Sequence, residues 1–299
     1  MKPLCLLAVA VPLAAALSAQ PRTRIPSVVK LRFGVYASEK ASEMYRSFAP
    51  VIEDLEELAT KHYGRPVVIE LRIDGTYEES MAAFLAGEVD VVRFGPASYV
   101  LAKERNPAIT LLAAEEDDGD KLVRGVIFVR KDSPIRALSD LAGRTFAFGD
   151  ESSTIGRYLV QAELVAAGIT AKDLRGFAYL GRHDAVVKAV QVGQYDAGSA
   201  HVATFERMDH KRELRVLKSF DNLSKAWLAR AGLAADVCAA LRKAVLDLER
   251  PASLAALKVT GFQPAEDADF DFVRAGMKQA RKFQPEPEPA PAPAPADGK

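Results

Sequence analysis

The chain has 299 residues, of which 49% are hydrophobic and 27% are charged, so it is long enough for about two globular domains with ordinary cores. Forty basic residues balance forty acidic residues. A nucleic-acid-binding surface or a polybasic membrane surface would show a basic excess, so the composition argues against both and leaves a small-molecule partner open.

The first residues predict a secretory signal peptide. Lys2 supplies the basic start, "PLCLLAVAVPLAAAL" the apolar run, and "LSAQ" at 17–20 the small residues of a cleavage site. The apolar run is shorter than the roughly 20 residues of a membrane-spanning helix, although an uncleaved anchor is the alternative. We expect residues 1–19 to be removed and the mature chain to enter the periplasm. Gln20 stands where a lipoprotein would carry cysteine, so no lipid anchor is expected.

Strand and helix patterns alternate through the first part of the chain. A β-rich strand is predicted at 29–36, followed by a helix at 42–64 that we expect to be interrupted at Pro50 and to end at Gly64. The next predicted elements are a strand at 66–74, a helix at 77–87, a strand at 88–95, a helix at 96–105 and a strand at 108–116. This alternation favours an α/β architecture with largely parallel sheets.

The second part repeats the alternation. The predicted elements are strands at 123–133, 144–149, 177–181, 195–200 and 214–220, and helices at 154–167, 183–193 and 201–208, with two or three more helices up to about Phe283. The spacing from Gly87 to Asp90 recurs from Gly193 to Asp196, each between a helix and a strand. The repetition indicates two similar α/β lobes.

We therefore predict four segments in the chain. They are the signal peptide 1–19, a discontinuous lobe 1 at 28–124 and 216–284, lobe 2 at 125–215, and a tail at 285–299. The tail, "PEPEPAPAPAPADGK", lacks the apolar residues of a core, so we expect it to be disordered with polyproline II character.

The stretch "GDESSTIGRYL" at 149–159 collects the hydroxyls of Ser152, Ser153 and Thr154 where a helix is predicted to begin. A helix start presents free backbone N–H groups and the positive end of the helix dipole, which together bind anions. One hydroxyl is enough for a helix cap, and Ser153 is well placed for it. The cluster is therefore interpreted as a candidate anion site, with plain capping as the alternative.

Other polar and aromatic residues recur where a predicted strand passes into a helix. They are Tyr36, Tyr77, Tyr99 and His183. In open α/β sheets ligands bind at the carboxyl ends of the strands. A purely structural role is the alternative for His183 taken alone.

Four stretches resemble one known family. "FGDESSTIG" is similar to the oxyanion loop, and "GRHDAVVKAVQVGQYDAGSA" to the His-Asp segment, of the PhnD-like phosphate-, phosphite- and phosphonate-binding proteins of ABC importers. Residues 31–56 and 77–104 are similar to the family's first strands and helices, and the match extends over roughly 29–220. The resemblance implies a type II periplasmic binding protein fold, with two α/β lobes of mostly parallel sheets flanked by helices, a two-strand hinge, and a ligand enclosed between the lobes.

The resemblance also implies a site. Ser153 and Thr154 fall on the family's Ser-Thr, His183 on its histidine, and Tyr77 on its aromatic residue. The predicted ligand-binding residues are Tyr36, Tyr77, Phe94, Tyr99, Ser152, Ser153, Thr154, His183 and Asp184.

Three positions depart from the family pattern. Glu151 replaces the proline of the loop. Ile155 replaces its second serine, which removes a hydroxyl and keeps the backbone N–H. Phe94 offers stacking without the hydroxyl that some members have.

By this resemblance the chain is a monomeric binding protein without a metal or cofactor. It would bring a small phosphorus oxyanion to the permease of an ABC importer. Asp184 and Asp196 are the nearest carboxylates for a ligand amine, and neither forms a convincing amine site, which favours an oxyanion or alkyl phosphonate.

Other functions fit the sequence less well or remain open. Ser153, His183 and Asp184 could be read as a catalytic triad, but the sequence lacks a Gly-x-Ser-x-Gly turn, and Asp184 adjoins His183 too closely to orient its ring. The sequence also shows neither a phosphate-binding loop nor zinc-ligand spacing, so an enzyme is not expected. A protein that signals to a membrane receptor or sensor kinase, and a binder of a sulfonate, an amino acid or a thiamine precursor, remain alternatives.

Overall fold

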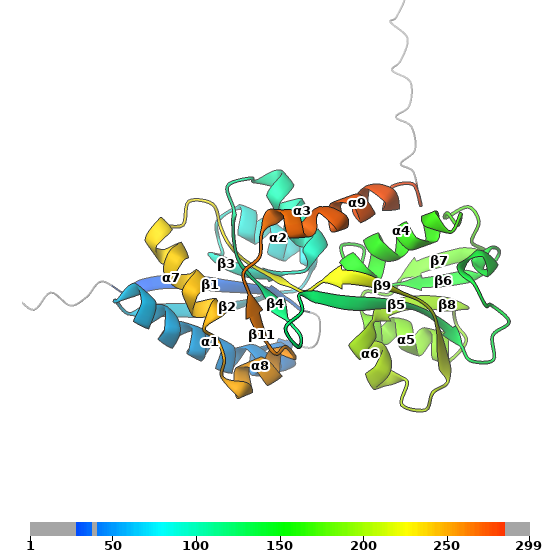
Figure 1. Ribbon diagram of the computed structural model, residues 1–299, viewed down its shortest axis with the longest axis horizontal. Helices are drawn as coiled ribbons and strands as arrows, with labels where there is room; N and C mark the ends of the chain where they lie inside the picture. The colour runs from blue at the N-terminus through cyan, green and yellow to red at the C-terminus, as the bar shows by residue number, and fades with distance from the viewer. Residues whose placement is uncertain (1–27, 38–40, 285–299) are drawn as a thin grey trace, which may run out of the picture.

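The computed structural model describes residues 28–37 and 41–284. Two lobes lie along the long axis of the molecule (Figure 1). The predicted signal peptide at 1–19 and the predicted tail at 285–299 lie outside the described residues. In the part of the chain that the structure describes, no helix is both long and apolar enough to cross a membrane.

Lobe 1 is built on a six-stranded sheet with the order β11-β4-β10-β3-β1-β2. The strands are β1 (Val29–Tyr36), β2 (Val67–Asp74), β3 (Val91–Phe94), β4 (Thr110–Glu116), β10 (Ala226–Ala229) and β11 (Gly261–Gln263). Strand β1 is parallel to β2 and β3, whereas β10 is antiparallel to β3 and β4, and β11 to β4. The sheet is therefore mixed, because the chain returns from lobe 2 and inserts β10 between two earlier strands.

Helices cover both faces of this sheet. They are α1 (Ala41–Tyr63), α2 (Tyr77–Leu85), α3 (Pro96–Arg105), α7 (Ala235–Leu246) and α8 (Pro251–Leu257). Phe33 of β1 packs with Leu55 of α1 and Leu241 of α7 in one core cluster. Phe94 of β3 packs with Phe84 of α2 in the cluster on the opposite face. Alternate residues of a strand point to opposite faces, so β3 contributes Val91 to the first core and Phe94 to the second.

The predicted interruption at Pro50 is wrong, because α1 continues through it from Ala41 to Tyr63. Proline removes one helical hydrogen bond. Phe48 before it is 3% exposed, and Leu55 after it is fully buried. Burial of the apolar face on both sides of the proline outweighs the lost bond. The predicted end is confirmed at Gly64, which adopts a φ of 76°.

Lobe 2 is built on a five-stranded sheet with the order β7-β6-β8-β5-β9. The strands are β5 (Leu122–Arg130), β6 (Thr145–Phe148), β7 (Gly176–Tyr179), β8 (Ala197–His201) and β9 (Leu214–Leu223), and the helices are α4 (Leu159–Ala166), α5 (His183–Gln191) and α6 (Val202–Met208). Strand β6 is parallel to β7 and β8, whereas β5 is antiparallel to β8 and β9. This sheet is also mixed rather than largely parallel.

The chain crosses between the lobes at two short segments, 117–121 and 224–225, which we call the crossing segments. We predicted the return to lobe 1 at 216, but β9 pairs with β5 over its whole length, so the return lies after Leu223. The two segments lie side by side, because the N–H of Ser224 donates to the carbonyl of Lys121 at 2.8 Å. The N–H of Glu115 also donates to the carbonyl of Lys225 at 3.0 Å.

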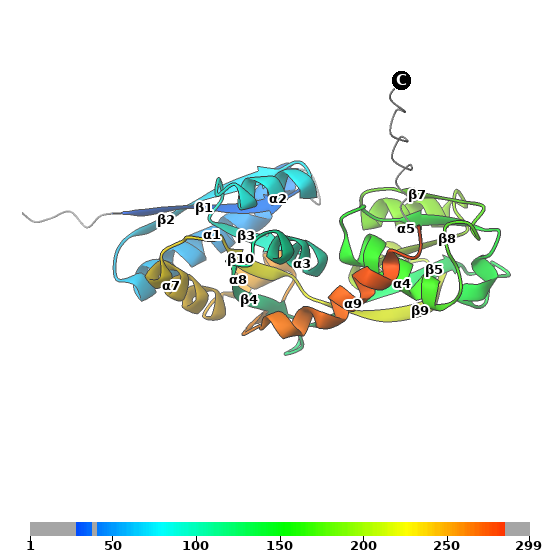
Figure 2. The same ribbon diagram turned by 90° about the horizontal axis from the view of Figure 1, so that it is seen from above.

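Helix α9 (Asp271–Ala280) forms a third connection between the lobes (Figures 1 and 2). Before it, Phe270 packs against Tyr99 of α3 in lobe 1, with ring centroids 4.2 Å apart. After it, the fully buried Phe283 packs against Phe148 and Phe177 of lobe 2 at centroid distances of 5.4 and 5.6 Å. The predicted lobe 1 segment 216–284 therefore begins and ends in lobe 2.

Candidate ligand-binding site

The loop after β6 folds as the sequence predicts around a serine cap. The Ser153 hydroxyl accepts the N–H of Gly156 at 3.0 Å. The first turn, Thr154–Tyr158, is a π-turn that continues into α4, a detail that the sequence did not indicate. A Cβ on Gly149 would lie 2.8 Å from the Cα of Gly156, so both positions need glycine for the loop to close.

Thr154 joins this loop to lobe 1. Its Oγ1 accepts the N–H of Ala97, at the start of α3, at 2.9 Å, and the residue is 5% exposed. A Cβ placed on Gly95 would lie 3.6 Å from Thr154 Oγ1 and 3.8 Å from the Tyr36 hydroxyl, so the three groups are neighbours. A hydroxyl that accepts one N–H still has its own hydrogen to donate. Two helix N-termini from different lobes therefore meet at a hydroxyl that can still donate.

Tyr36, at the end of β1, and Tyr77, at the start of α2, form a stacked pair beside this contact. Their ring centroids are 3.7 Å apart and their planes differ by 23°. Burial raises the pKa of Tyr77 well above its usual value, the neighbouring Tyr36 and Asp150 raise it further, and a hydrogen bond with Ser153 lowers it. Tyr77 is therefore a neutral hydroxyl that contacts the lobe 2 loop.

His183 begins α5, as the sequence predicts, and its Nδ1 is buried without a hydrogen-bond partner among the described residues. Burial lowers the pKa of His183 to about 4; His201 and Lys225 lower it too, whereas Asp184 and a hydrogen bond to the Ser199 backbone raise it. The ring is thus neutral at pH 7. A buried polar atom without a partner is costly, so Nδ1 is a candidate to bond an added ligand.

Two further basic residues lie at this place, and the sequence analysis missed both. The Lys225 Nζ, in a crossing segment, lies 5.3 Å from the centroid of the Tyr36 ring. Burial first, and Lys225 second, lower the pKa of His201. The Nδ1 of His201 accepts the N–H of Ala203 at 3.2 Å. His201 follows a predicted strand and could have been found by the strand-end rule, whereas Lys225 gave no signal.

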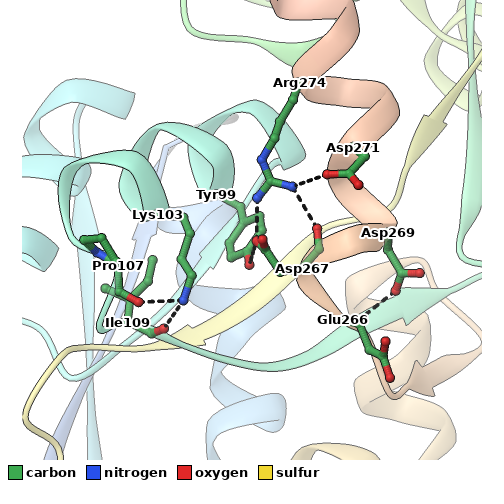
Figure 3. Close-up of polar contacts among 9 residues, drawn as sticks. All are labelled: Tyr99, Lys103, Pro107, Ile109, Glu266, Asp267, Asp269, Asp271 and Arg274. Atoms are coloured by element: carbon green, nitrogen blue, oxygen red, sulfur yellow. Dashed lines mark hydrogen bonds and ion pairs between the residues drawn. The ribbon is translucent and has the colours of Figure 1, made fainter.

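The structure does not bring Phe94 and Tyr99 to this group, contrary to our prediction. Each is 1% exposed. Phe94 packs edge-to-face on Phe84 at 5.6 Å in the lobe 1 core. The Tyr99 hydroxyl lies 2.5 Å from an Asp267 carboxylate oxygen, which also bonds Arg274 of α9 (Figure 3). Tyr99 follows the strand-end pattern and Phe94 the family resemblance, but Phe94 packs in the lobe 1 core and Tyr99 packs against Phe270.

The predicted carboxylates are already engaged. Asp184 pairs with Arg182 through two contacts of 3.0 Å, which hold its pKa below the usual value. Asp196 accepts the N–H and the hydroxyl of Thr145 at 2.8 and 2.9 Å, so its role is structural. The half-buried Ser152 donates its backbone N–H to Asp150 at 2.7 Å, which shapes the loop.

Two other features of the described residues were considered as binding sites, and neither is assigned a ligand. No group of three or more His, Cys, Asp or Glu residues in this part of the chain could hold a metal ion. A cavity of about 270 Å³ on lobe 1 is lined by residues that include Arg250, Asp54 and Asp247. Arg250 is already paired with Asp54 and Glu57, so we assign no ligand there.

Two mixed α/β lobes, joined by paired crossing segments and touching through polar helix starts, define a two-lobed periplasmic binding protein fold. A solved structure of PhnD1 from Prochlorococcus marinus in complex with methylphosphonate matches with a TM-score of 0.73 and 21% identity, over 85% of this chain and 98% of that one. The periplasmic aliphatic sulphonate binding protein SsuA from Escherichia coli matches with a TM-score of 0.58 and 20% identity, over 90% and 98%. The predicted fold is confirmed.

The sequence comparisons place the chain within this fold. The model of the family "ABC transporter, phosphonate, periplasmic substrate-binding protein" matches residues 33–270, and the chain belongs to this family. A probable ABC transporter phosphite binding protein of Prochlorococcus marinus is 30% identical over 138 residues, 44% of this chain and 46% of the relative. The phosphate-import protein PhnD of Mycolicibacterium smegmatis is 30% identical over 173 residues, 54% and 52% respectively. The alignments thus span about half the length of these relatives.

Proposed function

We propose that the protein captures a small phosphorus oxyanion between its lobes and delivers it to an ABC importer. The observation that carries the proposal is the Thr154–Ala97 contact, where hydroxyls and helix N-termini of both lobes converge. The family description and the names of the relatives, which include phosphite and phosphate binders, support the ligand class and the importer.

The residues at this place fit the chemistry of such an anion. The hydroxyls of Ser153 and Thr154 and the phenols of Tyr36 and Tyr77 are neutral donors, and the two helix starts add partial positive charge. Hydrogen bonds to a charged group contribute roughly 1.5–3 kcal/mol each. A handful of them reaches micromolar affinity, about −8.2 kcal/mol, after the costs of ordering.

The same contact explains how binding would close the lobes. Thr154 belongs to lobe 2 and Ala97 to lobe 1, so an anion bonded to both sides would hold the lobes together. The two short crossing segments provide the hinge between them. A ligand that contacts both lobes favours the closed state by its differential affinity for that state.

A binding role rather than catalysis is supported by where the triad candidates lie. Ser153 bonds Gly156 and Tyr77, and Asp184 is held by Arg182. The Ser–His–Asp relay that an acyl-transfer enzyme needs is therefore not assembled among these residues.

The test is a thermal-shift and affinity measurement with phosphate, phosphite, methylphosphonate and sulfate. A ligand at 100 times its Kd stabilises by about 2.7 kcal/mol, which raises Tm by roughly 5–10 °C. Thr154→Ala with His183→Ala should abolish this shift and leave the fold intact. The matched control, Thr170→Ala with His210→Ala, removes the same side chains from lobe 2 outside the site and should keep it.

The outcomes separate the site from the function. No response to any phosphorus anion would refute the proposed ligand class. A response that survives unchanged in the Thr154/His183 variant would keep the function and refute the site.

A further inference from the structure

Lys225 is held rigidly where the chain re-enters lobe 1. Its carbonyl accepts the N–H of Glu115 at 3.0 Å, and the preceding Ser224 donates its N–H to Lys121 at 2.8 Å. The backbone of this crossing segment is thus fixed by β4 and by the first crossing segment. Its side chain extends over the face of Tyr36, with Nζ 5.3 Å from the ring centroid, so the ammonium lies beside the Tyr36–Tyr77 pair.

The Lys225 ammonium has no carboxylate partner within ion-pair distance among residues 28–37 and 41–284. Three carboxylates influence the surrounding groups: Asp117 faces His201, Asp150 faces Tyr77, and Asp184 faces His183. Asp150 already accepts a loop N–H at 2.7 Å, and Asp184 is paired with an arginine.

The positive charge of Lys225 affects the pKa values of two neighbouring histidines. The pKa values of His183 and His201 are both lowered, chiefly by burial, and Lys225 contributes to each. Both rings are therefore expected to be neutral at pH 7, and the ammonium remains as a fixed, unpaired positive charge at the contact between the lobes. An unpaired cation that is half-buried is stabilised by an anion and repels another cation.

We propose that Lys225 is the cationic contact of the bound ligand and makes the site selective for phosphorus compounds that are anionic throughout, so that phosphonates carrying an ammonium group are rejected. The inference rests on the proposed function and narrows its substrate class. In this arrangement the Lys225 ammonium, in the crossing segment, attracts or repels the ligand's substituent according to its charge. The hydroxyls of Ser153 and Thr154 bind the phosphorus oxygens.

The test uses three probes of similar size that differ in the charge of the distal group. They are propylphosphonate, 2-aminoethylphosphonate and phosphonoacetate, titrated calorimetrically at pH 7.5. The wild type should bind 2-aminoethylphosphonate at least tenfold more weakly than propylphosphonate, and should bind phosphonoacetate at least as well as propylphosphonate. A tenfold difference corresponds to about 1.4 kcal/mol.

Variants of Lys225 provide the decisive comparison. Lys225→Gln should weaken propylphosphonate binding and remove most of the discrimination, and Lys225→Glu should reverse the order of the two uncarboxylated probes. The matched control is Lys218→Gln, on the preceding strand β9. Lys218 faces Glu163 at 3.8 Å, so this variant should bind like the wild type. Thermal unfolding of each variant without ligand checks that it folds.

The experiment distinguishes failure of this inference from failure of the proposed function. If propylphosphonate binds but the wild type binds 2-aminoethylphosphonate equally well, or Lys225→Gln keeps the wild-type preference, this inference is refuted and the proposed function stands. If the wild type binds phosphate or phosphite but none of these phosphonates, the inference is refuted and the proposed function stands. If it binds no phosphorus anion at all, the proposed function is refuted and the inference falls with it.

Discussion

The buried environment of His183 makes the stability of the protein depend on pH, and substitution of this residue measures its contribution. In the folded protein the pKa of His183 is lowered to about 4, first by burial and then by His201 and Lys225. In the unfolded chain it returns to about 6.5. Between these two values the unfolded state binds more protons, so the stabilising effect of the neutral ring is complete above pH 6.5 and is lost as pH falls towards 4.

The size of this loss follows from the difference between the two pKa values. A difference of about 2.5 corresponds to about 3.4 kcal/mol when the ring is fully protonated. Between pH 7.5 and pH 5.0 the His183 contribution is about 2 kcal/mol. The free energy of unfolding of His183→Gln should therefore fall by about 2 kcal/mol less than that of the wild type over this interval, because glutamine is neutral at both pH values.

Urea unfolding at the two pH values measures this difference. His210→Gln is the control, because this histidine lies on an exposed loop of the same lobe, and it should follow the wild type. Titratable groups far from His183 are the same in all three proteins and cancel in the comparison. Equal losses in wild type and His183→Gln would refute the view that His183 is held neutral by its surroundings.

Two further substitutions test the packing of lobe 2. A Cβ on Gly125 would lie 2.3 Å from the Phe220 ring, so Gly125→Ala should lower the free energy of unfolding by about 1–3 kcal/mol, whereas Gly176→Ala, with nothing within 4 Å, should change it by less than about 0.5 kcal/mol in urea unfolding. Phe283→Ala should cost about 3–5 kcal/mol in the same measurement, because the ring is fully buried against lobe 2; a loss below 1 kcal/mol would show that α9 is not anchored there.

The features that the sequence predicted well depend on local pattern. Ser153 caps its helix and His183 begins another because hydroxyl and polar residues at the end of a strand favour helix starts wherever they occur. Gly64 and Gly168 end helices with positive φ values of 76° and 79°, which a local pattern also indicates. These positions are fixed by a few neighbouring residues.

The features that the sequence missed depend on contacts between distant segments. Tyr99 follows the strand-end pattern and Phe94 the family resemblance, but their rings pack against Phe270 and Phe84, contacts with distant segments that neither the pattern nor the resemblance showed. Strand β10 is a four-residue run, "AWLA", that alternation cannot detect, and its insertion makes the sheet mixed. Lys225 was missed for the same reason, since its position beside Tyr36 appears only when the second crossing is placed after Leu223.

The anchoring of Phe283 in lobe 2 has a consequence for the newly made chain. The sheet of lobe 2 is complete once Leu223 has been synthesised, but its core needs a ring that follows about sixty residues later. Lobe 1 likewise waits for β10 and β11 to fill its sheet. Because domains fold as units when their chain is complete, neither lobe can close its core until synthesis is almost finished.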